Sequence, residues 1–157
     1  MAGILFTDSN LVLAGYSQHK QRIVGIGGKT QGSETPTLTA VREVLEELFE
    51  FENLDHSLIE VVHELLVFDA CVAYGKYTVY RMSFKDLQNI IDAVCVYGKE
   101  MVSNVYNNLP VSVEQLVFNR KPYKHAELSH LVLLPCESSM KISACLLADI
   151  QTFNRTV

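Results

Sequence analysis

The chain has 157 residues, of which 48% are hydrophobic and 20% are charged, and its formal net charge is −5. This length suits one domain over residues 1–157 with a substantial core. The acidic balance excludes long-range attraction for nucleic acid, and no apolar run is long enough to span a membrane. The start MAGILFTDSN lacks the features of a signal peptide, and the cysteines form no close pair. We therefore expect a cytoplasmic protein with no membrane partner.

The first third of the chain predicts short strands followed by a glycine-rich turn. Gly3–Phe6 and Leu11–Gly15 are predicted to form a hairpin, because Asp8, Ser9 and Asn10 between them favour a turn. Arg22–Ile26 is predicted as a third strand that leads into the glycines.

A helix is predicted from Pro36 to Phe49. Thr35 can cap its free backbone donors, and proline at the first helical position has no donor to lose. At roughly 3.6 residues per turn, Glu43, Glu46 and Glu47 project as one cluster. The opposite face carries an apolar stripe, made of Leu38, Val41, Val44, Leu45 and Leu48. The helix therefore presents acidic groups from a rigid element that is anchored on a core.

Later elements complete the expected fold. Glu60–Phe68 and Tyr74–Phe84 are predicted as a pair of strands, and Leu128–Leu134 as a late strand. Ile142–Phe153 has apolar residues at helical spacing. Mixed strands with helices on both faces predict an α/β sandwich.

Between the last strands lies an insert around residues 84–120. Apolar residues at helical spacing predict a helix over Phe84–Cys95 and a short one around Val113–Val117. The insert is either a specificity element or a structural addition, and in the second case it could form a homodimer surface. The basic segment 119–125 that follows could hold phosphate, or it is a solvated loop.

The carboxylates of the first helix predict a metal site. Three carboxylates this close repel one another unless a cation compensates. Oxygen ligands that leave room for water and phosphate favour Mg²⁺ or Mn²⁺ over zinc. Taken alone, the three glutamates would favour a solvated acidic face. The preceding turn Gly25–Lys29 changes that balance, because glycine allows a phosphate to approach the backbone closely.

Seven residues here keep a fixed spacing: Gly28, Glu34, Arg42, Glu43, Val44, Glu46 and Glu47. In this register the chain resembles the Nudix hydrolases. Their signature is glycine, five residues, glutamate, seven residues, arginine, glutamate, an aliphatic, any residue, two glutamates, any residue, glycine and an aliphatic. Phe49 and Glu50 stand where the family has the last glycine and aliphatic, so the helix could end differently. The resemblance implies a Nudix-like α/β/α sandwich with a mixed sheet, and hydrolysis of pyrophosphate bonds.

The resemblance also implies roles for single residues. Glu43, Glu46 and Glu47 would ligate the metals, with the Gly28 carbonyl as a backbone ligand. Arg42 would hold a carboxylate with its planar guanidinium and tie the loop to the helix. The catalytic residues would therefore include Glu46 and Arg42 beside the proton acceptor. That acceptor is Glu47 or, outside the signature, Glu127; an ordinary charged residue at a strand edge is the alternative for Glu127.

Four residues are candidates for substrate contact. Glu34 would pair with Arg42 in the loop, and Lys29 would meet a phosphate or remain solvated. His19 precedes the glycine loop and could enter the substrate site. His130 lies in the late strand, where many Nudix relatives carry an aromatic residue, and could contact a base.

Three functions remain in view. The first is metal-dependent hydrolysis of a free nucleotide, such as a nucleoside triphosphate or a dinucleotide-type substrate. The second is mRNA decapping with capped RNA as the partner; the insert and basic loop favour it, whereas the acidic charge disfavours it. The third is a Nudix fold that serves as a non-catalytic binding module. The presence of all three metal-binding glutamates disfavours this third function.

Overall fold

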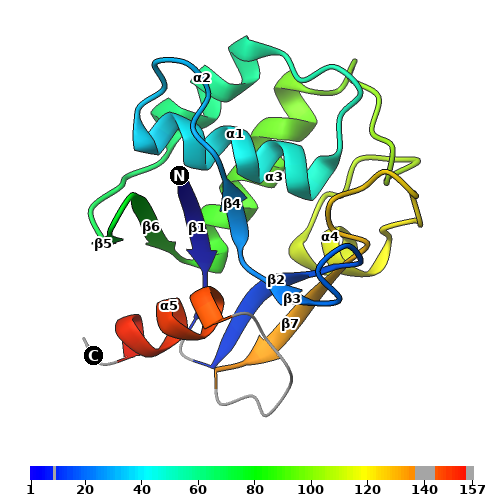
Figure 1. Cartoon of the computed structure of the whole chain (residues 1–157). Coiled ribbons are helices and arrows are strands. Elements are labelled where there is room, and N and C mark those ends of the chain that lie inside the picture. The colour runs from blue at the N-terminus through cyan, green and yellow to red at the C-terminus, as the bar shows by residue number, and fades with distance from the viewer. Residues whose placement is uncertain (9, 137–143, 155–157) are drawn as a thin grey trace.

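The computed structural model describes residues 1–8, 10–136 and 144–154. Figure 1 shows its mixed α/β architecture. The strands are β1 (Ala2–Phe6), β2 (Leu11–Ser17), β3 (Arg22–Val24), β4 (Ile26–Gly28), β5 (Cys71–Tyr74), β6 (Tyr77–Met82) and β7 (His130–Pro135). The helices are α1 (Pro36–Phe49), α2 (His56–Leu65), α3 (Phe84–Tyr97), α4 (Val113–Phe118) and α5 (Ala144–Asn154).

The strands form two sheets. One is mixed and has the order β4-β1-β6-β5, with β1 and β6 parallel and the other pairs antiparallel. The other has the order β3-β2-β7 and is antiparallel. The expectation of an α/β fold with a mixed sheet is therefore confirmed.

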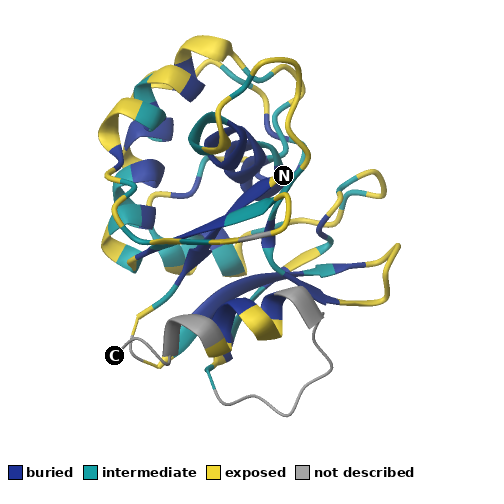
Figure 2. Cartoon of the chain, turned by 60° about the vertical axis from the view of Figure 1, so that its left-hand side comes forward, coloured by how far each residue is buried: buried dark blue, intermediate teal, exposed yellow. Residues whose placement is uncertain are grey.

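Strand β1 lies between two apolar cores. Ile4 and Phe6 belong to the main core, together with residues of α1, α2 and α3, whereas Leu5 belongs to a second cluster that includes Ile150 of α5. Successive side chains of a strand point to opposite faces, so β1 is covered on both sides. Figures 1 and 2 show α1, α2 and α3 gathered on one side of the mixed sheet and α5 on the other.

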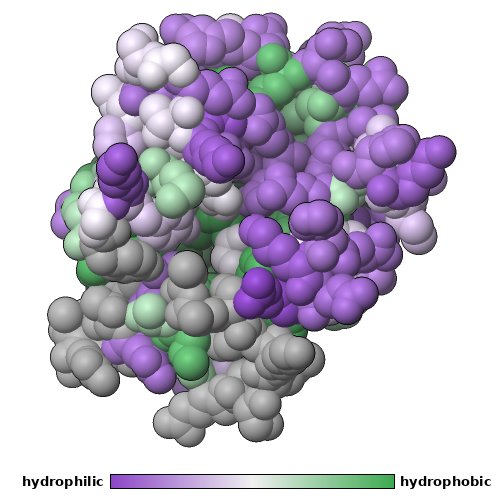
Figure 3. All heavy atoms as spheres, in the orientation of Figure 1, coloured by the Kyte–Doolittle hydropathy of each residue, from purple (hydrophilic) through white to green (hydrophobic). Residues whose placement is uncertain are grey.

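The described residues on the face shown in Figure 3 are mostly hydrophilic. Figure 3 shows hydrophobic residues there only in small separate patches. No helix among the described residues is long and apolar enough to cross a membrane.

Helix α1 has the predicted bounds. The Thr35 hydroxyl accepts a hydrogen bond from the Leu38 N–H at 3.3 Å, and Pro36 occupies the first turn. The helix ends after Phe49, and Glu50 adopts a left-handed conformation with φ 45° while its N–H donates to the Glu46 carbonyl. The left-handed cap is therefore present although a non-glycine residue forms it.

The strand predicted at Glu60–Phe68 is wrong. These residues lie largely in α2, which begins after Asp55, whose carboxylate accepts from the Ser57 N–H. Leu58, Ile59 and Val62 are its buried residues, and their three-to-four spacing is helical. The antiparallel partner of β6 is β5, which the sequence does not predict, and Gly75 with φ 60° lies in the turn between them.

The two opening strands are present, and the Asp8 carboxylate accepts hydrogen bonds from the N–H groups of Asn10 and Leu11 in the turn, but the predicted pairing of these strands as a hairpin is wrong. Strands β1 and β2 belong to different sheets and share only the isolated bridge between Thr7 and Val12. The strand predicted at Arg22–Ile26 is two strands, because the chain passes from one sheet to the other at Gly25. A short apolar strand does not encode which sheet it joins.

The two helices predicted in the insert are present as α3 and α4. Helix α3 is capped by Ser83 and Asp86, which exchange hydrogen bonds in a capping box. Its residues Leu87, Ile90 and Val94 are fully buried in the main core. Helix α3 is therefore part of the body of the fold rather than a peripheral addition.

The late strand and final helix also occur. Strand β7 begins at His130 and pairs with β2, so the predicted start at Leu128 was two residues early. Of the predicted final helix, residues 142 and 143 lie outside the described residues, and α5 covers the remainder.

Candidate functional site

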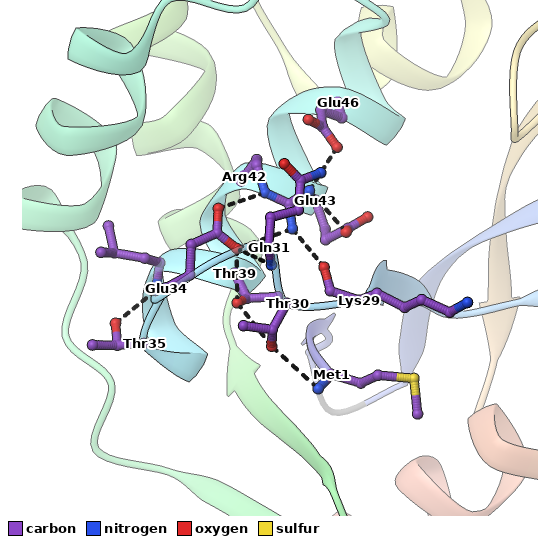
Figure 4. Close-up of polar contacts among 11 residues, drawn as sticks. Met1, Lys29, Thr30, Gln31, Glu34, Thr35, Thr39, Arg42, Glu43 and Glu46 are labelled. Atoms are coloured by element: carbon purple, nitrogen blue, oxygen red, sulfur yellow. Dashed lines mark hydrogen bonds and ion pairs between the residues drawn. The ribbon is translucent and has the colours of Figure 1, made fainter.

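Arg42 is the centre of a polar network on α1 (Figure 4). Its side chain is only 6% exposed. Its Nε and Nη2 donate to the two carboxylate oxygens of Glu34 at 2.7 and 3.1 Å, and Nη2 also donates to the Lys29 carbonyl at 2.7 Å. Its Nη1 donates to Glu43 Oε1 and to Glu46 Oε2, both at 2.8 Å. One planar guanidinium thus fixes the loop and two helix carboxylates together.

Glu34 is an orienting group for this network. Besides Arg42, it accepts hydrogen bonds from the Gln31 N–H at 3.1 Å and from the Thr39 hydroxyl at 3.0 Å. The hydrogen bonds from Arg42 hold the pKa of Glu34 below its usual value. Both oxygens of the Glu34 carboxylate therefore accept hydrogen bonds within the protein, and the carboxylate orients the Arg42 guanidinium. The expected tie between loop and helix is present.

Two glycines bring the backbone of β4 against the carboxylates. Gly27 has φ 149°, and a Cβ there would lie 2.5 Å from the Gly3 Cα. A Cβ at Gly28 would lie 2.5 Å from Glu43 Oε2. Only glycine fits both positions without a shift. The backbone of β4 therefore lies directly against the Glu43 carboxylate, without room for a side chain at residue 28.

Glu47 is the most deeply buried carboxylate of the group. It is 3% exposed, and its Oε2 accepts a hydrogen bond of 2.7 Å from the Gly27 N–H. Burial raises the pKa of Glu47 well above its ordinary value, and the negative charge of Glu127 adds to this effect. Among the described residues Glu47 forms no ion pair, unlike its neighbours Glu43 and Glu46. Glu47 is thus held by the Gly27 N–H rather than by a direct ion pair among these residues.

Glu127 lies beside this cluster, in the bend before β7 rather than in a strand. Its N–H donates to Glu50 Oε1 at 3.1 Å, and its charge raises the pKa values of Glu43, Glu47 and Glu50. Glu50 is a further carboxylate that the sequence analysis missed as a site residue. It follows Glu46 by four residues, so the spacing of α1 could have indicated it.

Arg120, from the basic segment 119–125, reaches this end of α1. Its guanidinium donates to the carbonyls of Glu47, Leu48 and Leu128 at 3.0, 2.6 and 2.9 Å. The last carbonyls of a helix have no intrahelical donors, so Arg120 satisfies two of them. The side chain of Arg120 is thus bonded within the protein and is not that of a solvated loop residue.

The other predicted contacts lie at the edge of the network. The backbone carbonyl of Lys29 accepts a hydrogen bond from Arg42, while the Lys29 side chain points away from Glu34 and Glu43 (Figure 4). His19 is exposed in the turn between β2 and β3, next to Lys20, whose charge lowers the pKa of Glu47. His130 is exposed at the start of β7 and interacts with the Ser129 hydroxyl at 3.0 Å. Neither histidine hydrogen-bonds to the carboxylate cluster within the described residues.

The donor set of this cluster suits a divalent cation of the magnesium type. Its side chains offer oxygen, and their negative charges outnumber the positive charge of Arg42. Glu43 Oε2 faces Gly28 and has no hydrogen-bond partner among the described residues. No group of three acidic, histidine or cysteine side chains in the described parts of the chain already surrounds one metal position. The residues fit the ion in chemistry and charge, and binding it would require side-chain rearrangement.

No protein-family model matches this chain, and no curated protein sequence matches it. The fold and site define an α/β protein with a carboxylate cluster at the junction of a glycine-rich strand and a helix.

Proposed function

We propose that this chain is a Nudix-like hydrolase of α/β/α sandwich architecture that uses Mg²⁺ or Mn²⁺. It would cleave a pyrophosphate bond in a nucleoside diphosphate linked to another group. The favoured substrate is a free nucleotide, such as a nucleoside triphosphate or a dinucleotide-type compound. The observation that carries the proposal is the Arg42 network, in which residues of the Nudix spacing make direct contacts.

Glu43, Glu46 and Glu47 are the residues that would hold the metal, with the carbonyl of Gly28 beside them. A divalent cation would lower the pKa of water and neutralise pyrophosphate charge. Arg42 keeps Glu43 and Glu46 from spreading apart, because one nitrogen of its guanidinium bonds to both carboxylates. The absence of a side chain at Gly28 lets the backbone of β4 lie directly against the Glu43 carboxylate.

Glu47 is the proposed proton acceptor for the attacking water. Burial raises its pKa, and a base whose pKa lies closer to neutral pH transfers protons more effectively. Glu127 is the second candidate, because its charge acts directly on Glu47 and its side chain is exposed to a substrate. Measuring kcat after replacing Glu47 or Glu127 by glutamine shows which of the two is the base. At saturating metal, glutamine in place of the true base should lower kcat by about 10² or more.

The test is product analysis with purified protein and Mg²⁺ or Mn²⁺. The panel contains normal and oxidised nucleoside triphosphates, ADP-ribose, dinucleoside polyphosphates and capped RNA. We expect metal-dependent release of a nucleoside monophosphate from a free nucleotide, and loss of this activity in Glu46→Gln plus Glu47→Gln. The exposed substitution Glu64→Gln on α2 is the matched control.

Two other outcomes would replace the proposal. Release of a capped nucleoside diphosphate from RNA alone would identify a decapping enzyme. Binding of metal with no turnover of any compound would favour a binding module. Unchanged activity in the double glutamine variant would show that the site is elsewhere.

A further inference from the structure

A surface pocket of about 510 Å³ lies in the insert. It is formed by the end of α3, by the segment from Lys99 to Leu109, and by Lys121. Its volume falls within the range of small-molecule sites, roughly 300 to 1,000 Å³. None of the residues of the carboxylate cluster lines it. It is therefore a separate cavity from the site described above.

The pocket is basic in an acidic chain. Lys99 and Lys121 line it, and no aspartate or glutamate does so among the described residues, although the chain carries a net charge of −5. Neither lysine forms an ion pair within the described residues. Lys121 Nζ donates one hydrogen bond of 2.8 Å, to the side-chain oxygen of Asn107. An ammonium group has three donors, so Lys121 keeps capacity for an anionic ligand.

Neutral groups of the pocket supply the rest of a ligand site. The side chains of Asn107 and Asn108 are exposed there and offer amide donors and acceptors. Met101 and Leu109 contribute partly buried apolar surface. Two cations, polar amides and an apolar wall form the combination that binds a phosphorylated organic molecule.

The floor of the pocket is held by hydrogen bonds to other elements. The Ser103 hydroxyl donates to the Phe49 carbonyl at 2.5 Å and accepts from the N–H groups of Val105 and Tyr106. The hydroxyl of Tyr106, which is 3% exposed, donates to the Leu116 carbonyl. These bonds fix the floor before any ligand arrives, which lowers the entropy lost on binding.

From these observations we infer that the pocket between α3, residues 99–109 and Lys121 binds a small phosphorylated molecule, with its phosphates on Lys99 and Lys121. The inference does not depend on the proposed hydrolase function, because it uses different residues. The pocket is nevertheless joined to the end of α1. The Asn104 N–H donates to the Glu50 carbonyl at 2.9 Å, and the Glu52 N–H donates to the Val102 carbonyl at 2.9 Å.

The test uses the full chain in EDTA, so that divalent metal does not load the carboxylate cluster. Pyrophosphate and AMP are titrated separately at constant ionic strength, with amide NMR shifts and calorimetry as readouts. We expect saturable shifts at residues 99–109 and 121. We also expect binding at least ten times weaker in Lys99→Ala plus Lys121→Ala. The matched control, Lys76→Ala plus Lys85→Ala, removes the same charge from exposed positions outside the pocket and should bind as the original chain does.

Three results would overturn the inference. They are no saturation for either probe by about 1 mM, equal affinity in the two double variants, or shifts confined to residues 27–30. Tighter binding of AMP than of pyrophosphate would support the part that the apolar wall plays in the inference. Because no turnover is measured, loss of the hydrolase proposal would leave this outcome unaffected.

Discussion

The backbone N–H of Gly27 donates a hydrogen bond of 2.7 Å to Oε2 of Glu47, and this links the glycine strand β4 directly to helix α1. The same carboxylate is nearly inaccessible to solvent and has its pKa raised by burial. A neutral isostere can keep the bond, because the oxygen of a glutamine also accepts from Gly27. Geometry and charge at this position can therefore be separated experimentally.

For Glu47→Gln we expect a fold at least as stable as the original at neutral pH, because a buried charge is removed and its hydrogen bond is kept. Hydrolytic activity should fall by about 10² or more. Urea unfolding and metal-dependent hydrolysis are measured on the same preparations, with Glu64→Gln as control. A destabilised but active variant would contradict both expectations.

The Arg42 network predicts a large cost for losing its cation. Replacing Arg42 by methionine removes the cation that pairs with Glu34, Glu43 and Glu46, and breaking a buried ion pair costs about 3–5 kcal/mol. Lysine keeps the charge but not the planar fork, so Arg42→Lys should fall between the two. Denaturant unfolding measures both variants, with exposed Arg22→Met as the control. A loss of less than 1 kcal/mol for Arg42→Met would show that the network contributes little.

Gly28 offers a test of the close approach between strand and carboxylate. In Gly28→Ala, the new Cβ would meet Glu43 Oε2 at 2.5 Å and push it aside, so we expect activity to fall strongly. Gly25→Ala is the matched control in the same segment, because its Cβ would only touch Leu146 at 3.6 Å. The hydrolysis rates of Gly28→Ala and Gly25→Ala are compared at saturating metal and substrate. Equal activity in both variants would remove Gly28 from the site.

Local signals were sufficient for α1 but not for its surroundings. Thr35, Pro36 and the apolar stripe fix the helix within one segment, and its bounds were predicted correctly. Strand pairing depends on distant residues, which is why β5 and the separation of β1 from β2 were missed. In Glu60–Phe68, the apolar run was interpreted as a strand although Asp55 is a helix cap. Short apolar runs are compatible with either structure.

In the site, too, the contacts within one segment were predictable from the sequence, whereas the contacts between distant segments were not. The contacts among Glu34, Arg42, Glu43 and Glu46 lie within one short segment, and their spacing was enough to predict that they belong together. The position of Arg120 depends on the return of the chain after the insert, 73 residues beyond Glu47. No local pattern encodes that return, so its role required the structure.

Arg120 therefore predicts a stability effect rather than a substrate effect. Arg120→Lys cannot reach the carbonyls of Glu47, Leu48 and Leu128 together, and lost hydrogen bonds to a charged group cost about 1.5–3 kcal/mol each. We expect a lower unfolding free energy, measured in urea beside Arg22→Lys. A variant of unchanged stability with a raised KM would instead indicate a phosphate contact.

Asp149 of α5 predicts how stability depends on pH. It is 3% exposed, its Oδ1 has no hydrogen-bond partner among the described residues, and burial raises its pKa to about 7. The folded state therefore holds this proton more tightly than the unfolded state does. Stability from this group is complete below about pH 4 and is lost as the pH rises to about 7 and beyond.

Asp149→Asn removes that dependence. At about 1.36 kcal/mol for each pKa unit, the ionised carboxylate destabilises the fold by up to roughly 4 kcal/mol at alkaline pH. We expect the variant to be more stable than the original chain at about pH 8 and similar to it near pH 4. Urea unfolding at both pH values measures this, with exposed Asp69→Asn as control. If the original chain and Asp149→Asn lose stability equally between these pH values, the buried carboxylate is not the cause, because asparagine cannot ionise.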